Sequence, residues 1–73
     1  MERQIYIALL EEGTRVWRPV QAFELGQNVF RISGEVPIDE VWQFQPGETV
    51  RCVEQQLDGV SCLVAVAPGA VGA

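Results

Sequence analysis

The chain has 73 residues, which is enough for one domain and too few for a second hydrophobic core. Its formal net charge is −5, and its five cations are arginines scattered along the chain, so nucleic-acid binding is disfavoured. It contains no histidine, the usual general base and the commonest metal ligand. We therefore expect no catalytic residues, no metal site and no cofactor.

The apolar segments are too short to cross a membrane. None approaches the run of about 18 residues that a membrane-spanning helix needs. The start of the chain, MERQIYIALLEEG, is too short and carries charges too early for a signal peptide. We predict a cytoplasmic protein with no membrane contact, and reduced thiols at Cys52 and Cys62.

The first two segments predict β-strands. Residues Gln4–Leu10 alternate in the manner of a strand, and the second segment runs from about residue 14 to residue 24. Strict alternation with Val20 inward would also turn Arg18 inward, which is costly for a charged group. We predict that a bulge at Pro19 avoids this cost, placing Trp17 in the core and Arg18 outside.

A hairpin should follow, with its loop at Leu25–Gln27. This loop places Val20 opposite Ile32 and Ala22 opposite Phe30, so that these four side chains share the buried face. The outward face of the hairpin then comprises Arg18, Gln21, Val29, Arg31 and Ser33.

The next segment is predicted to be a connecting loop with at most one helical turn, near Pro37–Glu40. Residues Val41–Gln45 read as a short strand, and Pro46-Gly47 is the pair favoured at the centre of a type II turn.

The last predicted hairpin joins Thr49–Gln56 to Val60–Val66. We favour a three-residue loop, Leu57–Gly59, over a two-residue Asp-Gly turn because the longer loop keeps the apolar residues on one face. That face would consist of Val50, Cys52, Cys62, Val64 and Val66. Residues 1–66 would form the domain, and residues 67–73, rich in small residues, Gly and Pro, a flexible tail.

Period-two patterning with Gly and Pro between segments predicts an all-β fold: a small barrel of five or six antiparallel strands. The pattern GTRVWRPV, then FRISG, then VWQFQPGETVRC resembles a family of small, uncharacterised bacterial proteins with SH3-like barrels, over about residues 4–66. This resemblance implies an SH3-like barrel and no particular activity.

A looser similarity connects the chain with Tudor-like barrels, which read peptides or nucleic acids through an aromatic cage. The aromatic residues available for such a cage also suit a barrel core, and we expect the core role. They are Trp17, Phe23, Phe30, Trp42 and Phe44.

The two cysteines are expected to be free thiols facing the core. In the predicted register they are diagonal neighbours, about 7–8 Å apart, which is too far for a comfortable disulfide. Without histidine or lysine nearby, neither is expected to act as a nucleophile.

Two surfaces are candidates for binding. Arg18 and Arg31, with Gln21 and Ser33, could hold a carboxylate or phosphate, although cross-strand pairing with Glu24, Glu35 or Glu54 is the simpler role. Apolar residues on the outward face suggest a contact with a protein partner or a homo-oligomer. They are Tyr6, Leu10, Val29, Val53 and Leu63. The first strand, Gln4–Leu10, is an edge strand available for such contacts.

These features favour a non-catalytic protein-interaction module that self-associates or docks on a protein. One alternative is a nucleic-acid-contacting adaptor that uses the arginine face. Another is an oligomeric pore enzyme, since the type II dihydrofolate reductase is built on an SH3-like barrel of similar length, whose binding motif is faintly matched by Gln4–Tyr6.

Overall fold

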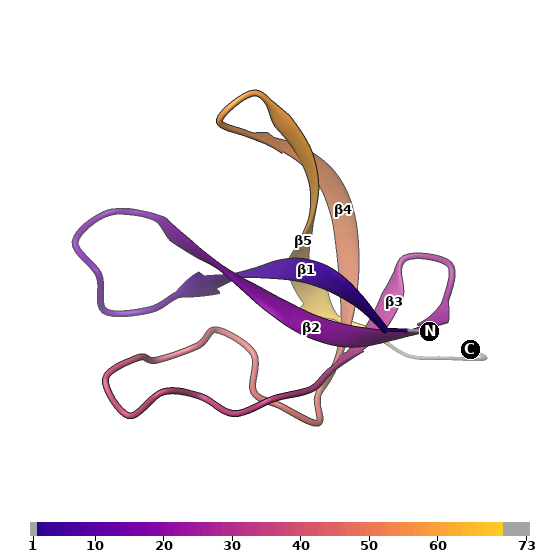
Figure 1. Cartoon of the computed structure of the whole chain (residues 1–73), viewed down its shortest axis with the longest axis horizontal. Helices are drawn as coiled ribbons and strands as arrows, with labels where there is room; N and C mark the ends of the chain where they lie inside the picture. Colours follow the sequence, from indigo (N-terminus) through magenta and orange to yellow (C-terminus); the bar gives the residue numbers. More distant parts are fainter. Residues whose placement is uncertain (1, 70–73) are drawn as a thin grey trace.

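The computed structural model describes residues 2–69, and in this range the chain is an all-β domain without helices (Figure 1). It has five strands, which confirms the predicted fold class. They are β1 (Glu2–Leu9), β2 (Val16–Gly26), β3 (Val29–Ile32), β4 (Thr49–Leu57) and β5 (Val60–Pro68).

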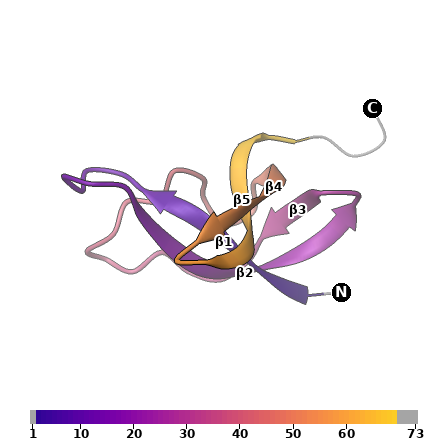
Figure 2. The ribbon, with the colours of Figure 1, turned by 90° about the horizontal axis from the view of Figure 1, so that it is seen from above.

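The five strands pair in sequence order and close into a ring. The four sequential pairs are antiparallel, and the ring closes through a parallel contact between β1 and β5, where Tyr6 lies opposite Val64. Figure 2 shows the ring from above, with β4 and β5 crossing over β1 and β2. Since β1 has a neighbour on each side, the prediction that it is an edge strand was wrong.

Alternation along the strands places one set of side chains inside the ring. Phe30 and the three isoleucines Ile5, Ile7 and Ile32 are fully buried, and together with their neighbours they form one apolar core. The cluster comprises Ile5, Ile7, Val20, Ala22, Phe30, Ile32, Trp42, Phe44, Val50, Cys52 and Ala65. The interior is therefore filled with side chains, and functional sites must lie on the outer surface.

Strand β2 has no bulge at Pro19. Its register with β1 is continuous, with Tyr6 opposite Pro19 and Ile7 opposite Arg18. The missing N–H of Pro19 is tolerated because this part of β2 lies before its pairing with β3, which begins at Ala22. Without a bulge, alternation places Arg18 on the same face of β2 as the buried Val20. Trp17 is half-buried on the outer face, not in the core as predicted.

The β2–β3 hairpin buries the predicted side chains in a different register. Ala22 pairs with Ile32 and Glu24 with Phe30, so the pairing is shifted by two residues from the prediction. A bulge between Glu24 and Gly26 absorbs the shift, and the turn moves to Gln27-Asn28, where Asn28 has a φ of 61°. A shift of two leaves the buried face unchanged.

The β4–β5 hairpin has the two-residue turn that the sequence analysis rejected. Leu57 pairs with Val60, and both Asp58 and Gly59 have positive φ, 52° and 80°, as a type I′ turn requires. From this turn the register is continuous as far as Cys52, which pairs with Ala65 on the inward face, and a bulge follows between Arg51 and Cys52. Val66, predicted inward, is exposed.

The segment between β3 and β4 closes one end of the ring. Its residues 41–45 make an isolated bridge, Leu9 to Trp42, and not the predicted strand. Trp42 and Phe44 nevertheless enter the core. The predicted type II turn is confirmed, since Gly47 has a φ of 91° and the Glu48 N–H donates to the Gln45 carbonyl at 3.0 Å.

The chain end departs in part from the predicted tail. Ala67 and Pro68 belong to β5, and the Gly69 N–H donates to the Thr49 carbonyl at 3.0 Å. The rest of the predicted tail, residues 70–73, lies outside the described part of the chain.

Candidate functional site

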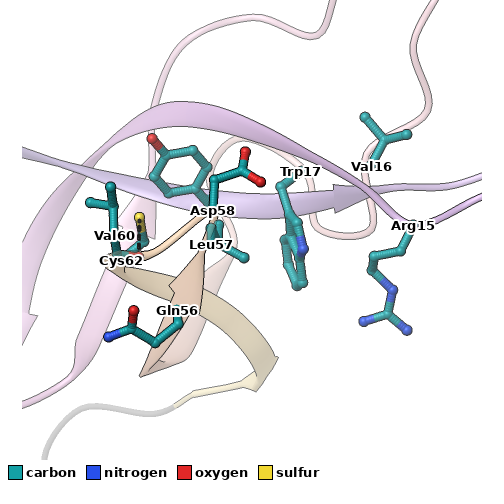
Figure 3. Close-up of a pocket in the computed structure, with 9 residues that line it drawn as sticks. Arg15, Val16, Trp17, Gln56, Leu57, Asp58, Val60 and Cys62 are labelled. Atoms are coloured by element: carbon teal, nitrogen blue, oxygen red, sulfur yellow. Dashed lines mark hydrogen bonds between the residues drawn. The ribbon is translucent and has the colours of Figure 1, made fainter.

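A groove of about 670 Å³ lies between the β1–β2 hairpin and the tip of the β4–β5 hairpin (Figure 3). Such a volume is typical of ligand sites. The groove is lined by Tyr6, Arg15, Val16, Trp17, Gln56, Leu57, Asp58, Val60 and Cys62. We refer to it as the outer groove.

One wall of the outer groove carries an aromatic ring and a cation. Arg15 ends the loop before β2, and its guanidinium lies 5.5 Å from the centre of the Trp17 ring. This distance is typical of a cation–π contact. In Figure 3 the Trp17 side chain projects toward the β4–β5 hairpin. The contact gives Trp17 a defined position while leaving the indole half-exposed.

The opposite wall follows from the two-residue turn at Asp58-Gly59. Because Leu57 pairs with Val60 and Gln55 with Cys62, alternation places Leu57, Val60 and Cys62 on the same hairpin face. Val60 is 61% exposed, although it is a large apolar residue. Asp58 adds a carboxylate at the hairpin tip (Figure 3). The groove thus combines an apolar surface with one charge of each sign.

The two cysteines lie in different environments. Cys52 is buried in the core, and its burial raises the pKa of the thiol to about 11. Cys62 is half-buried in the outer groove, with its sulfur 3.6 Å from the Val60 carbonyl oxygen. Both are free, as predicted, but the prediction that Cys62 faces the core was wrong, because the turn is one residue shorter than predicted.

The predicted anion-binding set is only partly brought together. Arg18, Gln21 and Ser33 line a second surface hollow of about 280 Å³, next to Trp42. Arg31 pairs with Phe23, five residues from Arg18 along β2, and alternation puts the two arginines on opposite faces of the sheet. The expectation that they share a face was wrong.

Arg18 is already paired with a carboxylate. Its Nε donates to Glu40 Oε1 at 3.0 Å, and its Nη2 forms an ion pair with Glu40 Oε2. The indole Nε1 of Trp42 also donates to Glu40 Oε1, at 3.0 Å. Pairing with a glutamate is therefore found, but the partner is Glu40 and not one of the three glutamates expected from the sequence.

The residues predicted to form an interface do not lie together on one surface. Leu10 and Val53 are exposed, and Tyr6 is half-buried in the outer groove. Val29 was predicted to face outward, but it is only 8% exposed. Leu63 packs against the core, because the shorter turn reverses its face.

The aromatic residues do not form a cage. Phe30, Trp42 and Phe44 are buried, in agreement with the expected core role, whereas Phe23 is exposed and Trp17 lines the outer groove.

Within residues 2–69, no cluster of histidine, cysteine or acidic side chains is arranged to hold a metal ion. The same residues contain no helix that could span a membrane.

The sequence analysis missed most of the groove, notably Arg15, Leu57, Asp58 and Val60. The available signal was the Asp58-Gly59 pair, which is typical of a two-residue turn. Accepting that turn would have placed Leu57 and Val60 opposite each other on one face.

No protein-family model matches the sequence, and no curated protein or solved structure shows significant similarity to it.

Proposed function

We propose that this protein is a non-catalytic protein-interaction module on an SH3-like barrel, and that the outer groove is its binding surface. The observation that carries the proposal is the pair of facing apolar walls, Trp17 on one side and Leu57 with Val60 on the other. Each wall belongs to a hairpin joined to the ring, so the groove does not depend on the ligand for its shape.

The chemistry of the groove suits a protein segment. Partly exposed aromatic and aliphatic side chains gain free energy when a partner removes them from water, at about 25 cal/mol per Å². Tryptophan and arginine are also the residue types that most often dominate interface energetics. Arg15 and Asp58 give the groove charges that can orient a bound segment. An extended peptide with an apolar side chain and flanking charges matches this arrangement.

The proposal can be tested by selecting displayed random peptides on the purified protein. Val60→Asp places a charge in the groove at an exposed position, so the fold should be retained. Val66→Asp is the matched control, because Val66 is an exposed valine of the same strand that does not line the groove.

We expect selected peptides to bind the wild type and Val66→Asp equally and to lose at least about tenfold in affinity for Val60→Asp, since a hot-spot residue contributes more than 1 kcal/mol. Peptides that bind all three proteins equally would show that the groove is not the binding surface. Binding of DNA or RNA that persists at physiological salt would favour the adaptor role instead.

A further inference from the structure

We propose that the outer groove binds a second copy of this chain, which inserts Ile38 between Trp17 and Val60. This inference rests on the proposed function and names the partner. Ile38 is 104% exposed and Val60 is 61% exposed, the two highest values among the large apolar residues of the described chain. A contact between them would remove both from water.

Ile38 is held at the tip of an anchored turn. The Glu40 N–H donates to the Pro37 carbonyl at 3.0 Å, which closes the turn around Ile38. The Glu40 side chain is bonded to both Arg18 and Trp42, so the turn is tied to the end of the ring. Pro37 further restricts the backbone before Ile38. This anchoring lowers the entropy that would be lost when Ile38 enters a partner.

The charges beside the two elements are complementary. Asp39 directly follows Ile38 in the sequence, while Arg15 lies next to Trp17 in the groove. Arg15 forms no ion pair with a carboxylate within residues 2–69. An inserted turn can therefore present the Asp39 carboxylate to Arg15 when Ile38 contacts the apolar walls.

One chain cannot fill its own groove in this way. In Figure 1 the segment containing Ile38 lies on the opposite side of β2 from the β4–β5 tip that forms the groove wall. The contact must therefore join two copies. Because it uses different surfaces on the two copies, each chain can offer a turn to one neighbour and a groove to another, which produces a ring or an open chain.

The test uses Ile38→Asp, which removes the inserted side chain, and Val60→Asp, which spoils the groove. Light scattering coupled to size exclusion is measured over a range of concentrations. We expect the wild type and the control Val66→Asp to self-associate, and each of the two variants alone to be monomeric. Circular dichroism confirms that the variants are folded, and Ile38→Ser checks that the effect does not need an added charge.

The decisive measurement is a mixture of the two variants. Ile38→Asp keeps an intact groove and Val60→Asp keeps an intact turn, so the mixture should form a heterodimer of one copy of each and grow no further. A monomeric wild type at the highest concentration would overturn this proposal, and so would a mixture that stays monomeric. Either result leaves the peptide selection above as a separate test of the proposed function.

Discussion

The molecule contains two clusters built from an arginine, a tryptophan and an acidic residue. They differ in how many of their polar groups are bonded to one another and in how deeply the tryptophan is buried. At one end of the ring, Glu40 bonds both Arg18 and Trp42, and Trp42 is 4% exposed. In the outer groove, Arg15 lies over Trp17, which is half-buried, and Asp58 stands on the facing hairpin. The same residue types thus form a closed cluster in one place and an open one in the other.

The difference follows from backbone position. Trp42 enters the core from a long connecting segment, whose Glu40 can fold back over Arg18. Trp17 lies on the outer face of β2 and lines the outer groove, whose other wall is the β4–β5 hairpin. In Figure 1 this hairpin curves away from β2. The closed cluster therefore contributes to stability, and the open cluster is left available for a partner. Substitutions in each cluster separate these two roles.

Truncation of the two tryptophans should have the largest effect on the free energy of unfolding. Trp42→Ala should lower the free energy of unfolding by about 3–5 kcal/mol, because it empties a buried site in the core. Trp17→Ala should cost about 1–2 kcal/mol, since a half-exposed side chain buries less apolar surface. Urea denaturation of both variants measures the difference. Equal losses would contradict the assignment of Trp42 to the core and Trp17 to the groove.

The core should also be sensitive to alkaline pH through Cys52. Its pKa is raised from 9.0 to about 11, so the folded state holds the proton more tightly than the unfolded state between these values. This contribution to stability is complete below pH 9 and is lost as the pH rises through 11. The loss between pH 9 and pH 11 is about 2 kcal/mol.

Urea denaturation of the wild type and of Cys52→Ala across this pH range provides the check. The variant should lack the additional loss of stability that Cys52 causes. Parallel curves for the two proteins would contradict the assigned burial of the thiol.

The acids of the two clusters should respond differently to substitution. Glu40→Ala should cost about 1–3 kcal/mol, because it leaves the buried indole N–H of Trp42 without its acceptor. Glu40→Gln should cost less, since an amide oxygen still accepts a hydrogen bond. Asp58→Asn should leave the thermal midpoint unchanged, because Asp58 is exposed and asparagine tolerates the positive φ of the turn. A large loss for Asp58→Asn would show that the open cluster is structural.

The smallest effect concerns labelling of the thiols, which should leave the fold intact. Cys62 should react with a maleimide in the folded protein, whereas Cys52 should react only when denaturant is added, because it is 1% exposed. Mass spectrometry of Cys52→Ala and Cys62→Ser assigns the reaction to each site. Native labelling of Cys62→Ser at the wild-type rate would show that the core opens at Cys52.

The two hairpins show where sequence reasoning succeeded and where it stopped. In the β2–β3 hairpin the pairing was displaced by two residues, yet Val20, Ala22, Phe30 and Ile32 still share the buried face, because side chains alternate with a period of two. In the β4–β5 hairpin the loop was one residue too long, which reversed the faces of Cys62 and Leu63. Because of this one-residue error in loop length, the sequence analysis did not predict the outer groove.

The sequence by itself determined the all-β class, the buried face shared by Val20, Ala22, Phe30 and Ile32, and the turn at Pro46-Gly47, because these depend on local alternation and on backbone preferences. Only the tertiary structure decided the pairing of Arg18 with Glu40, the parallel closure of β1 on β5, and the placing of Trp17 opposite Val60. Each of these joins residues far apart in the chain. Local patterning indicates which residues share a face of one strand, but it does not reveal which distant segments of the chain meet.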